Sequence, residues 1–278
     1  MPAPERPSQR EYWNSKVGEE WANQADRMDR ILAPLTEAAL RTLALEPGER
    51  VLDIGCGAGA TTLAMAQTIG AAGAIVGVDL SRPLLDVARK RAGAANISFV
   101  EADAGAAPIP GAPFDAAFSR FGVMFFEDPP AAFKQLRGGM RAGGRLVFVS
   151  WRSFPENLWT YAPLAALTPL LSAPLPPPDP DAPGPFGLSD PAKIERVLGA
   201  AGWSDITVAR WDGDMRLGAD APEAAQFLLK IGPCARAVSD QQIDPSKAET
   251  SLTEFLRAHE TPAGVALPAA CWIVQARA

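Results

Sequence analysis

Strand-like and helix-like patterns alternate between about residues 50 and 150, and this alternation constrains the fold most. Short, largely apolar runs typical of strands recur there at 50–53, 74–79, 97–101, 114–119 and 145–150. Near-continuous apolarity is typical of strands that helices cover on both faces. Strands that alternate with helices form βαβ units around a parallel sheet. The sequence therefore predicts an α/β fold with a mostly parallel sheet.

Capping residues and prolines predict the elements around these strands. Ser81 caps a helix that stops near Gly93, and Asp128 caps another that runs past Met140 to Gly143. Further helices are expected over residues 19–43 (one or two), 190–201, 222–238 and 245–260, and further strands over 205–211 and 271–277. Eleven prolines between residues 155 and 191 exclude continuous regular structure there and predict a lid or wrapped loop.

These segments predict one structural domain with several parts. A chain of 278 residues can bury a sizeable core without disulfides or metal. The expected parts are an N-terminal helical lid over 1–48, a cofactor-binding α/β core over 49–152, a proline-rich lid over 153–190, and the remainder of the core over 191–278 with a helical insertion at about 218–262.

Charge and cysteine content narrow the class of partner. The 26 Lys and Arg residues against 32 Asp and Glu residues give a net charge of −6, which disfavours nucleic acids and anionic membranes. Cys56, Cys234 and Cys271 are far apart and only one histidine is present, so neither a disulfide framework nor a metal site is expected. The N-terminus has no apolar leader segment, and no apolar run long enough to span a membrane occurs. We expect a cytoplasmic protein with a small-molecule partner.

A glycine-rich turn follows the first predicted strand and opens a helix. Gly55, Gly57 and Ala60 fit the dinucleotide-binding fingerprint, so the turn alone also permits a nicotinamide cofactor. Asp53 precedes the turn, and a fixed anion beside a pyrophosphate would cost Coulomb energy in a partly dehydrated cleft. A phosphate-free cation such as S-adenosylmethionine would be stabilised there, and Asp79 at the next strand end is positioned to bind the ribose hydroxyls.

The following strand ends agree with this interpretation. Asp103 and the neighbouring backbone lie where an adenine amine and ring nitrogen can be met. An apolar aromatic segment, 119–126, follows the fourth strand at the carboxyl edge of the sheet, where open α/β sheets bind ligands.

Together these motifs resemble a known family over residues 50–152. The matching residues are Asp53-Ile-Gly-Cys-Gly-Ala-Gly59, Asp79-Leu80, Ala102-Asp103-Ala104, Phe114-Asp115 and Arg141-Ala-Gly-Gly-Arg-Leu146. The region resembles class I S-adenosylmethionine-dependent methyltransferases, in the broad group that includes ubiquinone/menaquinone-biosynthesis methyltransferases. The family usually has Pro where Ala142 stands. The resemblance implies a Rossmann-like seven-stranded sheet with helices on both faces and an antiparallel last strand, and methyl transfer from S-adenosylmethionine.

Candidate site residues follow from these patterns and from the resemblance. For the cofactor they are Asp53, Gly55, Cys56, Gly57, Asp79, Leu80, Ala102, Asp103, Ala104, Ser119, Phe121 and, from an N-terminal helix that closes over the cofactor, Trp13 and Trp21; for the substrate they are Phe121, Met124, Trp151 and Arg152. Helix anchoring explains the two N-terminal tryptophans equally well. Cys56 is expected to be a small buried filler, because no cation lies near it to activate its thiol.

No residue is assigned to proton transfer. Methyl transfer is a direct displacement, and orientation of the acceptor supplies much of the rate. The only histidine, His259, lies in a polar helix where solvent exposure is a more economical interpretation than a general base. Two other functions remain open: a nicotinamide-dependent oxidoreductase, and a non-catalytic cofactor-binding protein on the same fold.

Overall fold

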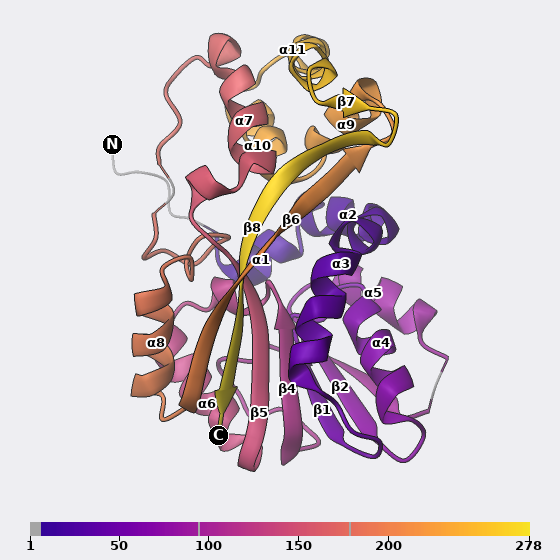
Figure 1. The fold of residues 1–278 in the computed structure, drawn as a ribbon, viewed down its shortest axis with the longest axis vertical. Coiled ribbons are helices and arrows are strands. Elements are labelled where there is room, and N and C mark those ends of the chain that lie inside the picture. Colours follow the sequence, from indigo (N-terminus) through magenta and orange to yellow (C-terminus); the bar gives the residue numbers. More distant parts are fainter. Residues whose placement is uncertain (1–6, 94, 178) are drawn as a thin grey trace.

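The computed structural model describes residues 7–93, 95–177 and 179–278 (Figure 1). Residues 1–6, 94 and 178 fall within the predicted N-terminal, core and proline-rich parts and lie outside the described residues. Among the described helices, none combines the length and the apolarity that crossing a bilayer requires.

A twisted sheet forms the centre of the fold, and its path has the order β3-β2-β1-β4-β5-β8-β6. The strands are β1 (Arg50–Ile54), β2 (Ala74–Asp79), β3 (Ile97–Glu101), β4 (Phe114–Arg120), β5 (Met140–Trp151), β6 (Ser204–Gly218) and β8 (Gly264–Arg277), and the two-residue β7 (Glu260–Thr261) pairs with β8. Strands β1 to β5 pair in parallel, whereas β8 is antiparallel to both β5 and β6. The predicted mostly parallel sheet with an antiparallel last strand is confirmed, and the short β7 adds an eighth strand to the predicted seven.

Helices pack along the sheet and above its carboxyl edge. They are α1 (Gln9–Trp13), α2 (Lys16–Asn23), α3 (Ala25–Leu43), α4 (Ala60–Ile69), α5 (Arg82–Arg91), α6 (Pro129–Gly138), α7 (Leu158–Ala166), α8 (Pro191–Ala200), α9 (Ala221–Leu228), α10 (Gly232–Asp240) and α11 (Pro245–Arg257), with short 3₁₀ turns at Val123–Phe125, Phe154–Glu156 and Thr168–Leu170. Helices α4 and α5 contact β2, α3 crosses β4 and β5, and α6 packs against α8. The apolar side chains between these layers form the main core.

Two of the predicted helical segments differ from the structure. The helix that Asp128 caps ends at Gly138, and Met140 is the first residue of β5. Gly139 caps the helix C-terminus, so the glycine pair at 138–139 stops the helix, in keeping with the poor helix propensity of glycine. The segment 222–238, predicted as one helical stretch, contains α9 and α10 with a break at the positive-φ residue Gly232.

Strands β6 and β8 extend well beyond the predicted runs and form a long two-stranded ribbon. Their register continues from the Ser204–Arg277 pair to the Gly218–Val265 pair. The upper part of this ribbon leaves the sheet, and α7, α9, α10 and α11 gather beside it (Figure 1). Helix α7 lies inside the proline-rich segment, with Pro163 in its interior. Helices α7, α9, α10 and α11, here called the cap, lie beyond the carboxyl ends of the parallel strands.

Candidate active site at the carboxyl edge of the sheet

The glycine turn after β1 brings two backbone segments into close contact. Gly55, Gly57 and Gly59 all have positive φ angles, which L-residues with a side chain rarely adopt. A Cβ atom on Gly55 would lie 2.7 Å from the Cα atom of Gly122, in the segment after β4. The turn therefore needs glycine for its conformation and also for the approach of the neighbouring strand end.

Asp53, near the end of β1, is fully buried and only partly satisfied. Its Oδ2 accepts hydrogen bonds from the hydroxyls of Thr61 (2.7 Å) and Thr62 (2.6 Å), whereas Oδ1 has no hydrogen-bond partner among the described residues. Burial raises the pKa of Asp53 to about 6, although the threonine hydroxyls and Arg120 act in the opposite direction. The result is a desolvated carboxylate with one oxygen free to accept.

Asp79, at the end of β2, folds back onto the glycine turn. Its Oδ2 accepts from the backbone N–H of Gly57 and its Oδ1 from that of Ser81, both at 2.8 Å. Burial raises the pKa of Asp79, and the two backbone donors lower it in part. The structure thus brings together Gly57 and Asp79, two residues predicted to hold the cofactor.

The ends of β3 and β4 complete this edge. The backbone N–H of Ala102 donates to the carbonyl of Asp79, and Asp103 accepts from the backbone of Gly105 at 2.8 Å. Ala104 is buried. Ser119 is also buried, donates to the carbonyl of Ile54 and accepts from the backbone that follows β4. These residues lie at adjacent strand ends, and their contact with a cofactor stays a prediction.

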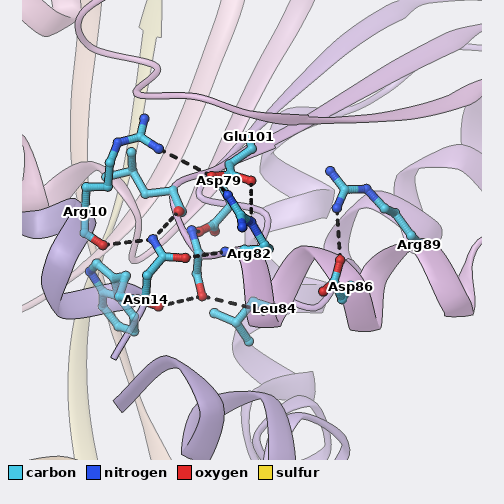
Figure 2. A network of polar contacts seen from close by, with 11 residues as sticks. Arg10, Asn14, Asp79, Arg82, Leu84, Asp86, Arg89 and Glu101 are labelled. Carbon is cyan, nitrogen blue, oxygen red and sulfur yellow. Dashed lines mark hydrogen bonds and ion pairs between the residues drawn. The ribbon is translucent and has the colours of Figure 1, made fainter. Parts of the chain in front are cut away.

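The N-terminal helix α1 is fastened over the ends of β2 and β3 (Figure 2). The Asn14 side chain donates to the carbonyl of Leu80 and accepts from the backbone N–H of Arg82. Arg10 and Arg82 both pair with Glu101, and the Ser81 hydroxyl donates to the carbonyl of Trp13. The sequence analysis places Trp13 on an N-terminal helix without giving its bounds, although the Ser8–Glu11 capping box marks where α1 begins.

Trp13 and Trp21 pack edge to face beside this lid. Their ring centroids are 5.8 Å apart, and Trp13 also meets Phe125 at 5.3 Å. All three are partly buried. The rings thus anchor α1 and α2 against the segment after β4, and a role toward the cofactor stays a prediction.

The ends of β4 and β5 carry a stack of aromatic rings. Phe121 lies parallel to Trp151, with centroids 4.1 Å apart and planes at 11°. Trp151 in turn contacts Trp159 of α7 at 5.2 Å. Met124, predicted to line the substrate site, is buried near this edge. Trp159 was missed by sequence reasoning, because its position depends on α7, which the prolines concealed.

The remaining candidates have clear local environments. Arg152 is 5% exposed, and it pairs with Glu156 and with Asp212 (2.6 Å). An anion-binding role for Arg152 stays a prediction. Burial raises the pKa of the Cys56 thiol, in agreement with a filler rather than a nucleophile. His259 is exposed, and its ring lies 5.0 Å from that of Phe255, tilted by 49°.

Comparison with known proteins identifies the core. The model of a methyltransferase domain matches residues 51–144. Aklanonic acid methyltransferase DauC of Streptomyces sp. (strain C5) is 37% identical over 106 residues, covering 37% of this chain and 48% of that protein. The 2-phytyl-1,4-naphtoquinone methyltransferase of Synechococcus elongatus is 36% identical over 111 residues, covering 38% and 48%. The chain thus spans about half the length of these curated relatives.

The fold extends the likeness beyond the matched core. Phosphoethanolamine N-methyltransferase 2 of Haemonchus contortus, solved in complex with S-adenosyl-L-methionine, superposes with a TM-score of 0.59 at 17% identity and covers 98% of this chain and 60% of that chain. At this identity the likeness concerns the fold alone. Residues 51–144 thus match a methyltransferase domain in sequence, and the likeness in fold covers nearly the whole chain.

Proposed function

We propose that the whole chain is an enzyme that transfers the methyl group of S-adenosylmethionine to a small molecule by in-line displacement. The observation that carries the proposal is the pair of desolvated carboxylates, Asp53 and Asp79, on either side of the glycine turn. They stand at the carboxyl ends of two neighbouring parallel strands. Such strand ends are where open α/β sheets bind ligands.

The unpaired oxygen of Asp53 shows whether the residues present fit this cofactor. A buried carboxylate oxygen without a partner is costly, and a nearby cation stabilises the charged form. The sulfonium and ammonium groups of S-adenosylmethionine supply that charge, whereas a pyrophosphate would add negative charge beside Asp53 and Asp79. The residues fit a cationic nucleoside, and no comparison favours the nicotinamide alternative.

The chain would contribute binding and orientation. When bound, S-adenosylmethionine supplies an activated methyl group. Asp53 would face its cationic end, Asp79 would exchange backbone donors for ribose hydroxyls, and Asp103 would meet the adenine amine. The aromatic side chains after β4 and β5 exclude water and orient the acceptor, and such orientation contributes about 7–11 kcal/mol where the geometry is good.

The acceptor class rests on the relatives and on the aromatic edge. DauC and the naphtoquinone methyltransferase are both named for small-molecule acceptors. In this chain the rings of Phe121 and Trp151 stack at the carboxyl edge of the sheet. We infer a small, flat organic acceptor. The net charge of −6 disfavours a nucleic-acid partner, and three buried free thiols accord with a reducing, cytoplasmic location.

Calorimetric titration with S-adenosylhomocysteine, and with NAD as the competing ligand, tests this function. We expect binding of the first only. Asp79→Ala should weaken that binding by at least about tenfold. The substitution removes the carboxylate that would accept charge-assisted hydrogen bonds from the ribose hydroxyls. Asp86→Ala on α5, which removes an exposed carboxylate paired with Arg89, is the matched control and should leave the affinity unchanged. Binding of NAD without S-adenosylhomocysteine would refute the proposal.

A further inference from the structure

The indole nitrogen of Trp159 is a buried donor without a partner. The residue is 5% exposed, and its Nε1 makes no hydrogen bond to any described residue. Two other buried tryptophans are satisfied: Trp203 donates to the carbonyl of Phe133 at 2.9 Å, and Trp272 donates to that of Ser189 at 2.7 Å. Among the described tryptophans, Trp159 is thus the one whose indole nitrogen is itself buried and has no hydrogen-bond partner.

An unpaired buried donor in a native protein has a desolvation cost and calls for an explanation. Phenylalanine would fill much of the same space without that cost. The second residue of α7 thus carries a polar group that packing alone does not require, which points to a partner outside the protein.

The surroundings of Trp159 indicate the shape of that partner. Phe121, Trp151 and Trp159 form a continuous series of rings, with centroid distances of 4.1 and 5.2 Å, at the carboxyl ends of β4 and β5. Phe121 also belongs to the residues predicted to contact the cofactor. Flat conjugated molecules pack well on such ring faces. The series thus leads from a residue predicted to contact the methyl donor to the ring of Trp159.

The N-terminus of α7 is fixed firmly enough to orient this donor. The buried Asn157 precedes α7, and its Oδ1 accepts from the backbone N–H of Ala270 in β8 at 3.0 Å. Its Nδ2 donates to the carbonyls of Arg152 and Ser153, both at 3.2 Å. Asn157, two residues before Trp159, thus ties α7 to the segment that follows β5 and to the middle of β8.

We propose that Trp159 binds the methyl acceptor by donating its indole N–H to an oxygen of a flat, conjugated molecule such as a quinone or phenol, with Trp151 and Phe121 packing on its rings. This assignment rests on the proposed function, because it names the acceptor class and a specificity residue of the same site. Trp159 is a binding and positioning residue and exchanges no proton with the acceptor.

Two probes that differ in their oxygens test the proposal. Anthraquinone-2-sulfonate offers carbonyl oxygens, and anthracene-2-sulfonate is the matched ring system without them. Each is titrated into the full chain with and without saturating S-adenosylhomocysteine. The variant is Trp159→Phe, which keeps an aromatic ring and removes the donor. The matched control is Trp203→Phe, which lies at the start of β6, at the opposite edge of the sheet.

We expect the wild type to bind the quinone more tightly than the hydrocarbon. Trp159→Phe should weaken quinone binding by about three- to tenfold, the value of one hydrogen bond, and leave hydrocarbon binding unchanged. It should also leave the melting temperature unchanged or raised, whereas Trp203→Phe should lower the melting temperature and preserve both affinities. An equal effect of Trp159→Phe on both probes, or no quinone preference in the wild type, would overturn the assignment. Failure of S-adenosylhomocysteine to bind, with the quinone effect intact, would instead remove the proposed function.

Discussion

Replacement of Asp53 by asparagine separates the electrostatic cost of this residue from its packing. Asparagine has nearly the same shape, and its amide oxygen can accept the hydroxyls of Thr61 and Thr62 as Oδ2 does now. The titratable charge is lost. The amide nitrogen then takes the place of Oδ1. Its buried N–H costs free energy of folding, but this cost is the same at each pH because an amide does not titrate.

The pKa of the Asp53 carboxyl gives the size of the pH-dependent change in the free energy of unfolding. Burial raises this pKa from an ordinary value of 3.8 to about 6. Between these pH values the folded protein binds the proton more tightly than the unfolded chain does, so the contribution of Asp53 to stability falls as the pH rises. The total loss is about 3 kcal/mol, complete above the folded-state pKa.

Urea unfolding of the wild type and Asp53→Asn between about pH 4 and pH 8 measures this loss. Other groups also titrate in this window, so the quantity of interest is the difference between the two unfolding free energies at each pH. We expect this difference to move in favour of the variant by about 3 kcal/mol on going from the acid to the neutral end. A difference that is constant across the window would refute the claim that Asp53 is buried as a strained carboxylate.

Two further substitutions probe the turn and the acceptor side. Gly55→Ala should destabilise the fold by about 1–3 kcal/mol in urea unfolding, because a residue with positive φ would also press a Cβ against Gly122; unchanged stability would contradict the close contact. Trp151→Ala should lower turnover with any accepted substrate by at least about tenfold while S-adenosylhomocysteine affinity in calorimetry stays within about twofold, since the ring packs on Phe121 rather than on the glycine turn. An equal loss of S-adenosylhomocysteine affinity would instead show that Trp151 contributes to cofactor binding.

The sheet could be predicted from sequence where local pattern and tertiary environment agree. Strands β2 and β3 have the bounds that their apolar runs predict, although β2 is largely buried and β3 is a partly exposed edge strand. Strand β8 was predicted only over its last residues. Its first half lies in the ribbon with β6, where an interior proline, Pro268, and alternating burial conceal the strand. The length of the ribbon depends on pairing between distant segments, which no local window contains.

The candidate site divides in the same way. The neighbourhood of Asp53, Gly57 and Asp79 could be predicted, because parallel strands in sequence order place their carboxyl ends at one edge. The contact of Trp159 with Trp151 could not. It requires the cap to return to the end of β5, and Asn157 secures this through a hydrogen bond to Ala270, a residue far along the chain. The acceptor side is therefore set by long-range packing, and the cofactor side by local motifs.

Phe121 belongs to both predicted sets of site residues, and its backbone conformation is unfavourable. Its φ of 66° lies in the left-handed region, where a residue with an aromatic side chain is strained by about 1–3 kcal/mol. Two contacts hold it there: its N–H donates to the carbonyl of Val149 at 3.1 Å, and its ring stacks on Trp151. A glycine at 121 would relieve the strain but lose the ring. Because the chain keeps the ring at a position that favours glycine, we infer that the stack serves the site rather than the fold.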